Sequence, residues 1–113
     1  MSLKFGTSGL RGLVTDLVGR ASYGYALAFL RVMSQRGEPR TVLIGRDLRA
    51  SSPEIAGLVA AAARDEGFET LDAGALPTPA LALEAGRLGI PAVMVTGSHI
   101  PEDRNGLKFY TPA

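Results

Sequence analysis

The sequence contains no cysteine, no tryptophan and only one histidine among its 113 residues. Without cysteine there are no disulfide bonds, thiolate zinc sites or cysteine nucleophiles, and His99 alone cannot form a histidine-based metal cluster. An excess of one sign of charge is also lacking, because 12 Lys and Arg face 11 Asp and Glu. A net charge of +1 supplies no cationic field, so we expect no nucleic-acid partner.

Long apolar runs are absent too. The longest, residues 55–63, has 9 residues and includes Gly57, whereas a membrane-spanning helix needs about 20 apolar residues. The N-terminal residues show no basic, apolar and small-residue succession of the kind that marks a signal peptide. We therefore expect no membrane partner and a soluble, cytoplasmic protein that folds as one domain.

Short periodic segments separated by Gly and Pro predict alternating helices and strands. Ser22, Ser51 and Thr78 are expected to cap three helices, with Pro53 and Pro79 in the first turn of the last two. These helices are expected at residues 22–37, 51–66 and 78–88. Strands are expected at residues 41–45, 68–72 and 92–95, of which the first and last are continuous apolar runs typical of buried strands.

Two further segments are expected to contain strands. Residues 4–13 are rich in glycine and predict a short strand, a tight loop at residues 6–9 and a return. Asn105-Gly106 predicts a turn into a returning strand at residues 107–110. The order of elements indicates an α/β fold with three layers, α/β/α, around a mixed, mostly parallel four-stranded sheet whose last strand is antiparallel. Ligands bind such sheets at the carboxyl ends of the strands.

Ser98 is the candidate nucleophile at one of these strand ends. It follows a buried strand and Gly97, which suits an exposed and rigidly held hydroxyl, and an ordinary turn serine fits the same spacing. A hydrolase elbow is excluded because glycine is missing two residues before and two residues after Ser98. His99 adjoins Ser98 in sequence, so it is poorly placed as a triad base, and the chain has no P-loop motif.

Several other groups suit an anion such as phosphate. The loop at residues 6–9 offers backbone amides together with the hydroxyls of Thr7 and Ser8. The candidate cations are Arg11, Arg46 and Lys108. Taken singly, each of these groups is more typical of a turn or of a solvated surface charge than of a phosphate site.

Four sets of residues occur in an order that is similar to the motifs of a known family. They are Phe5–Gly12, Gly45-Arg46-Asp47, Pro77-Thr78-Pro79, and Val95–Pro101 followed by Asn105–Lys108. Together they resemble the α-D-phosphohexomutase superfamily, most closely the bacterial phosphomannomutases and phosphoglucomutases. The usual serine loop of that family is Thr-Ala-Ser-His-Asn-Pro, from which Gly97 and Ile100 depart.

The resemblance implies an isomerase that moves a phosphoryl group between the 1 and 6 positions of mannose or glucose phosphate. Ser98 would be the phosphoserine, and a bisphosphorylated hexose would be both the intermediate and the activator. His99 and Lys108 would transfer protons to and from the sugar hydroxyl. The residues implied to brace the phosphate are Thr7, Ser8, Arg11 and Arg46. We expect the three cations to converge on Ser98.

The resemblance also implies Mg²⁺, which the family holds with a run of alternating aspartates in a second domain. No two aspartates of this sequence are two residues apart, so only the Ser98 phosphate would contact the metal here. We therefore interpret residues 1–113 as the phosphoserine-bearing domain I, truncated near its C-terminal end, with domains II–IV absent. The remaining domains would be its partners, and the isolated chain is expected to be inactive. The alternative is a module of the same fold that binds phosphate or sugar phosphate without catalysis, or that self-associates.

Overall fold

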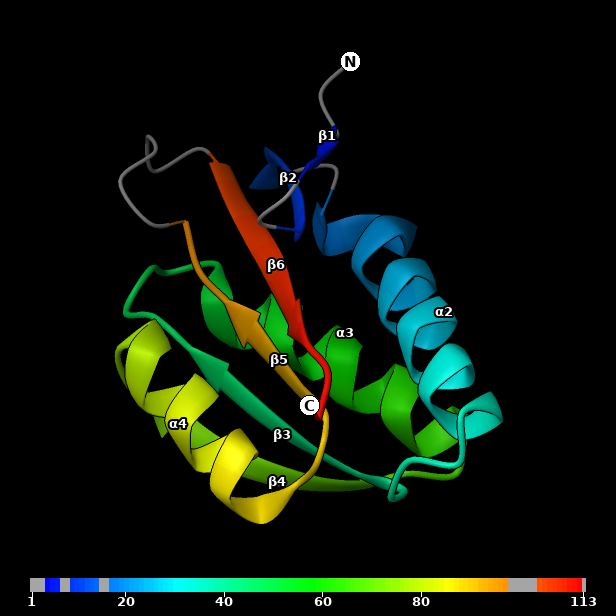
Figure 1. Ribbon diagram of the computed structural model, residues 1–113. Helices are drawn as coiled ribbons and strands as arrows, with labels where there is room; N and C mark the ends of the chain where they lie inside the picture. Colours follow the sequence, from blue (N-terminus) through cyan, green and yellow to red (C-terminus); the bar gives the residue numbers. More distant parts are fainter. Residues whose placement is uncertain (1–3, 7–8, 15–16, 98–103, 113) are drawn as a thin grey trace.

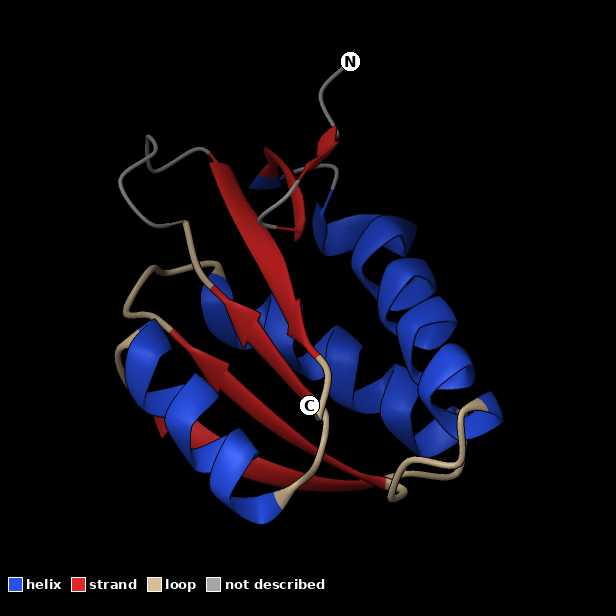
Figure 2. Ribbon diagram, viewed as in Figure 1, coloured by secondary structure: helices blue, strands red, loops and turns tan. Residues whose placement is uncertain are grey.

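The computed structural model describes residues 4–6, 9–14, 17–97 and 104–112, which form one sheet with helices on both faces (Figures 1 and 2). The strands are β1 (Lys4–Gly6), β2 (Gly9–Leu13), β3 (Thr41–Arg46), β4 (Glu69–Ala75), β5 (Ala92–Val95) and β6 (Arg104–Tyr110). The helical elements are the π-helical turn η1 (Leu17–Ala21), α2 (Ser22–Gln35), α3 (Ser52–Asp65) and α4 (Thr78–Leu88). None of the helices in these ranges is long and apolar enough to cross a membrane.

The strands lie in the order β1-β2-β6-β5-β3-β4. Strand β3 pairs in parallel with both β4 and β5, whereas β6 is antiparallel to β5 and to β2. The α/β class and the antiparallel last strand are thus confirmed. The described sheet has six strands rather than the expected four because the N-terminal hairpin joins it, with Leu10 of β2 opposite Leu107 of β6.

Two apolar cores lie between the sheet and its helices, which confirms the three-layer arrangement. One core joins the sheet to α2 and α3, and the other joins it to α4, on the opposite face in Figure 1. Successive side chains of a strand face opposite sides of a sheet. In β5, Val93 and Val95 therefore pack in the α2–α3 core while Met94 packs in the α4 core. This two-sided burial is the reason for the continuous apolar run in the sequence.

Three expectations about local structure are wrong. Asn105 and Gly106 do not form a turn but lie inside β6, where both residues are buried. Ser51 stands at the N-cap of α3, yet its side chain makes no capping hydrogen bond. Its Oγ instead accepts a hydrogen bond from Asn105 Nδ2 at 2.8 Å. Ser22 and Thr78 are the first residues of α2 and α4 rather than their caps.

Candidate functional site

Polar residues meet where the parallel strands β3 and β5 end. Asp47 directly follows β3, and Thr96 and Gly97 directly follow β5. The backbone N–H of Asp47 donates to the carbonyl of Val95 at 2.9 Å, and the N–H of Thr96 donates to the carbonyl of Gly106 at 3.0 Å. The ends of β3 and β5 and the beginning of β6 therefore lie side by side, at the sheet edge where ligands bind in folds of this class.

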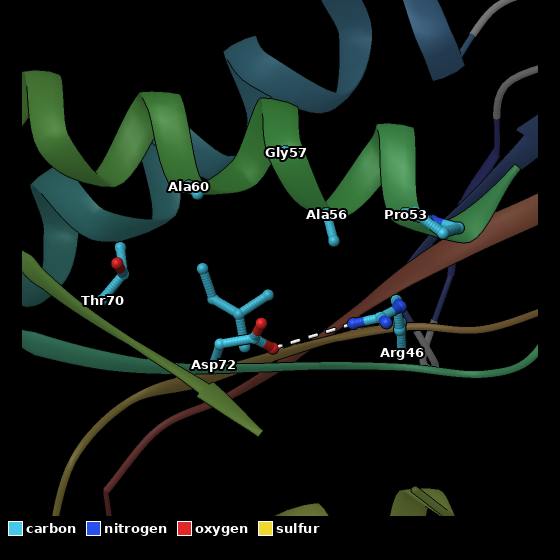
Figure 3. A pocket seen from close by; sticks show the side chains of 8 residues that line it. Arg46, Pro53, Ala56, Gly57, Ala60, Thr70 and Asp72 are labelled. Atoms are coloured by element: carbon cyan, nitrogen blue, oxygen red, sulfur yellow. Dashed lines mark ion pairs between the residues drawn. The ribbon is translucent and has the colours of Figure 1, made fainter. Parts of the chain in front are cut away.

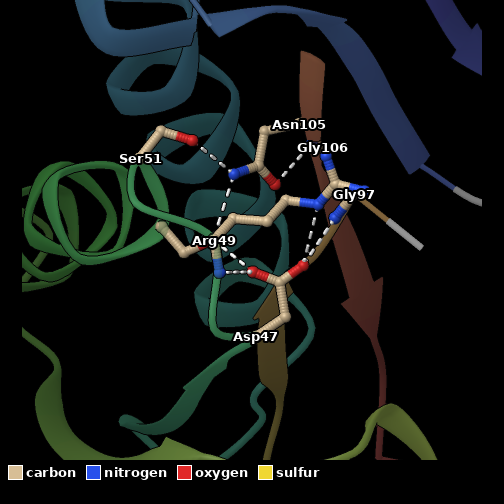
Figure 4. A network of polar contacts seen from close by, with 7 residues as sticks. Asp47, Arg49, Ser51, Gly97, Asn105 and Gly106 are labelled. Atoms are coloured by element: carbon tan, nitrogen blue, oxygen red, sulfur yellow. Dashed lines mark hydrogen bonds and ion pairs between the residues drawn. The ribbon is translucent and has the colours of Figure 1, made fainter. Parts of the chain in front are cut away.

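The Asp47 carboxylate is the centre of this junction (Figure 4). Its Oδ1 accepts hydrogen bonds from the backbone N–H of Arg49, at 3.1 Å, and from the Ser52 hydroxyl. Its Oδ2 accepts the backbone N–H of Gly97 at 2.9 Å and lies 3.4 Å from Arg49 Nε. One carboxylate thus ties the loop after β3, the first turn of α3 and the end of β5 together.

These contacts keep Asp47 ionised. Burial by itself would raise the pKa of the Asp47 carboxyl, because the charged form loses solvation. Hydrogen bonds from the Ser52 hydroxyl, from the backbone N–H groups of Gly97 and Arg49, and from the Thr96 side chain outweigh burial and lower this pKa below its ordinary value. Asp47 is therefore a fixed negative charge at neutral pH and is not suited to act as a general acid.

Asn105 extends the network into β6. The side chain is fully buried, and its Nδ2 donates to Ser51 Oγ at 2.8 Å and to Ser52 Oγ at 3.0 Å. Its Oδ1 accepts the backbone N–H of Gly106 at 2.8 Å. Because Ser52 in turn donates to Asp47, a continuous chain of hydrogen bonds runs from β6 through the first turn of α3 to the end of β5. Buried polar networks whose members all have partners fix a single local arrangement.

Three members of this network, Asp47, Arg49 and Asn105, are not among the site residues expected from the sequence. The sequence contained one indication that Asn105 belongs to the site. Asn105 is a polar side chain in an otherwise strand-like segment, and such an amide needs hydrogen-bond partners once it is buried. The interpretation of the Asn-Gly pair as a turn concealed this indication. For Asp47 no local signal existed, because its partner Gly97 lies 50 positions away in the sequence.

Arg46, an expected phosphate-bracing residue, lies away from this network. Its side chain lines a hollow of about 300 Å³ between α3 and the strands β3 and β4, together with Pro53 and Ala56 (Figure 3). There its Nη1 lies 3.7 Å from Asp72 Oδ1. Asp72 is 81% exposed, so this ion pair is a weak surface contact.

Lys108 lies on the other face of the sheet from Arg46. Lys108 is opposite Met94 in the register of β5 and β6, and Met94 packs in the α4 core. Its strand neighbours Leu107 and Phe109 pack on the α2–α3 side, as expected from the alternation of a strand. The sheet therefore separates the side chains of Arg46 and Lys108. Ser98, on which they are expected to converge, lies outside the described residues.

The remaining expected site residues are only partly within the described structure. Arg11 belongs to β2, where its backbone pairs with Gly106 of β6, at the same end of the sheet as the Asp47 network. Thr7, Ser8, Ser98 and His99 lie outside the described residues. Ser98 is nevertheless bonded to Gly97, whose N–H is held by Asp47.

The described residues do not fit a metal site. They contain no group of three or more His, Cys, Asp or Glu side chains placed to hold an ion. Both Asp47 oxygens already accept hydrogen bonds, and Oδ2 also faces Arg49. Mg²⁺ prefers carboxylate and phosphate oxygens in octahedral geometry, and this part of the chain supplies no such set.

Comparisons with known proteins point to one family. The family model described as "Phosphoglucomutase/phosphomannomutase, alpha/beta/alpha domain I" matches residues 2–113. A phosphomannomutase of Sinorhizobium fredii is 56% identical over 99% of this chain and 24% of its own length. A phosphoglucosamine mutase of Thermobifida fusca is 39% identical over 97% of this chain and 26% of its own length. The chain thus spans about a quarter of the length of the curated relatives it matches.

A solved structure agrees with the sequence matches. A putative phosphomannomutase from Thermus thermophilus superposes with a TM-score of 0.79 at 28% identity. The superposition covers 98% of this chain and 26% of that chain. Similarity of sequence and similarity of fold therefore extend over the same, nearly complete, length of the chain.

Proposed function

Because the chain belongs to the phosphoglucomutase/phosphomannomutase family as its alpha/beta/alpha domain I, we propose that it is the phosphoserine-bearing part of a hexose phosphate mutase. The enzyme would interconvert hexose 1-phosphate and hexose 6-phosphate, with mannose or glucose phosphate as substrate. Ser98 would give its phosphoryl group to the sugar and recover one from the other end of a bisphosphorylated intermediate. The serine regains one phosphoryl group for each one that it gives, so the reaction is a rearrangement with no net hydrolysis.

The observation that carries this proposal is the Asp47 network. A partly buried, ionised carboxylate holds the backbone N–H of Gly97, and Gly97 is bonded to Ser98. Phosphoryl transfer requires accurate positioning of the attacking and leaving oxygens more than covalent work by the protein. A rigid anchor one residue before the acceptor serine supports this requirement.

The proposed roles of the other residues are those that the resemblance to the family implies. His99 and Lys108 would move protons to and from the sugar hydroxyl. The groups proposed to brace the phosphate are Thr7, Ser8 and Arg11. Arg46 is left out of this set, because its side chain lines the hollow under α3. Mg²⁺ is given no step, since the described residues do not fit it.

The test is a chimera that restores a full-length enzyme. Residues 1–113 replace the corresponding segment of the Sinorhizobium fredii phosphomannomutase, and turnover of mannose 1-phosphate is measured with Mg²⁺ and a bisphosphorylated hexose. We expect activity that Ser98→Ala lowers at least about a thousandfold, because the nucleophile is lost. Ser34→Ala, on α2, is the matched control and should keep full activity.

Two outcomes would count against the proposal. Full activity of the Ser98→Ala chimera would exclude Ser98 as the acceptor. A stable but inactive unaltered chimera would favour the alternative, a non-catalytic module that binds sugar phosphates or associates with itself.

A further inference from the structure

Gly97 and Arg49 are packed against each other at the end of β5. The Arg49 side chain is only 11% exposed, and it runs beside the backbone of Gly97 (Figure 4). A Cβ atom at residue 97 would stand 2.8 Å from Arg49 Cδ and closer still to Nε and Cζ. These separations are shorter than non-bonded atoms tolerate, so the guanidinium fills the space that a side chain at residue 97 would take.

The same location carries a negative charge. Asp47 Oδ2 accepts the N–H of Gly97 at 2.9 Å, and the lowered pKa of Asp47 keeps this carboxylate ionised at neutral pH. Residue 98 is covalently bonded to Gly97, and consecutive Cα atoms are about 3.8 Å apart. A phosphate on residue 98 would add about −1.5 to −2 charge near this carboxylate. Like charges within a Debye length of about 10 Å repel one another appreciably.

Arg49 is placed to cancel this repulsion. Its Nε lies 3.4 Å from Asp47 Oδ2, and the backbone N–H of the same residue donates to Oδ1. We propose that Arg49 is a positioning residue for Ser98: packed on Gly97, it neutralises the Asp47 carboxylate, so that this carboxylate can anchor the loop without repelling an anion on the next residue. The inference rests on the proposed function, since it takes residue 98 as the phosphate carrier.

Two consequences separate this role from simple packing. The first is electrostatic: without the guanidinium, a phosphate on residue 98 should destabilise the fold. The second is steric: a methyl group at residue 97 should be harmful only while the Arg49 side chain occupies its place.

The electrostatic consequence is tested on the 113-residue chain with phosphoserine genetically encoded at position 98. Urea unfolding of the phosphorylated and unphosphorylated chains gives the effect of the phosphate on the folding equilibrium constant. We expect less than about a twofold effect in the parent chain and a loss of roughly three- to tenfold in Arg49→Gln, which removes the charge and keeps most of the length. Arg49→Lys, which keeps the charge, should recover most of this loss.

Arg87→Gln is the matched control, because Arg87 is 68% exposed and pairs with Glu84 near the far end of α4. It removes the same charge and should leave the effect of the phosphate unchanged. An equal effect of the phosphate in the parent, Arg49→Gln and Arg87→Gln chains would overturn the electrostatic role.

The steric consequence is tested with Gly97→Ala in two backgrounds. We expect it to lower the folding equilibrium constant roughly three- to fivefold in the parent chain, because the end of the Arg49 side chain must shift, and less than about twofold in Arg49→Ala, where the side chain is removed. Equal losses in both backgrounds would contradict the packing on which the proposal stands. Because the phosphate is installed directly, these results do not depend on whether the native enzyme phosphorylates Ser98. Failure of the proposed role of Arg49 can therefore be told apart from failure of the proposed function.

Discussion

The substitution Asp47→Asn tests how much of the site depends on one carboxylate. Asparagine keeps the shape of the side chain, but it offers one accepting oxygen where the carboxylate offers two. If that oxygen keeps the Oδ1 bonds, the amide nitrogen faces the N–H of Gly97, which is left without an acceptor inside a buried segment. The ion pair to the largely buried Arg49 is lost as well.

The cost can be estimated from these contacts. A buried donor left unsatisfied costs about 1–3 kcal/mol, and loss of the charged partner adds to it, so we expect a total of about 2–4 kcal/mol. With a urea dependence of about 1–3 kcal/mol per molar, the unfolding midpoint should fall by at least about 0.7 M. Far-UV circular dichroism is the suitable probe, because the chain has no tryptophan.

Asp72→Asn is the control at a neighbouring strand. Asp72 is 81% exposed and its ion pair with Arg46 spans 3.7 Å, so we expect a loss below about 0.5 kcal/mol. The reasoning about the network is refuted when both variants shift the midpoint by the same amount.

The other predictions concern pH, the buried amide and catalysis. The pKa of Asp47 is lower in the folded chain than the unfolded value of about 3.9, so its contribution to stability should be present above that value and disappear as the pH falls through the folded pKa. Urea midpoints measured from neutral to acidic pH should therefore fall more steeply for the parent than for Asp47→Asn, and parallel curves would contradict this. Asn105→Asp should destabilise the fold by roughly 3 kcal/mol or more at neutral pH, because it buries a carboxylate and removes both donors to the serines; an unchanged melting temperature would count against it. The isolated chain, given mannose 1-phosphate, Mg²⁺ and a bisphosphorylated hexose, should form no mannose 6-phosphate, and robust turnover would disprove its dependence on further domains.

Much of the fold follows from local patterns in the sequence. The apolar run of residues 92–95 coincides with β5, and the helix expected at residues 78–88 coincides with α4, which ends before Gly89 at a φ of 68°. Glycine is favoured in that left-handed conformation, so the end of this helix could be predicted from a single residue. The pairing of the N-terminal hairpin with β6 could not be predicted in this way, because it depends on contacts between segments far apart in the chain.

The site was predictable in location and less so in its members. The strand-end rule points to Arg46-Asp47 and to the residues after β5, and the Asp47 network lies at these strand ends. The Arg46 side chain lines the hollow between α3, β3 and β4, whereas the Asp47 carboxylate contacts both Ser52, in the first turn of α3, and Gly97. These contacts depend on how segments far apart in the sequence pack together, which the motif itself does not contain.

The central claim is that Ser98 carries the phosphoryl group, and phosphopeptide mapping tests it most directly. The active chimera is incubated with a bisphosphorylated hexose, digested, and examined by mass spectrometry for the peptide that contains residues 98–103. We predict one phosphate per chain, on Ser98, that is lost when a hexose monophosphate is added as acceptor. A stoichiometric phosphate on any other residue, or none at all in an active enzyme, would contradict the account.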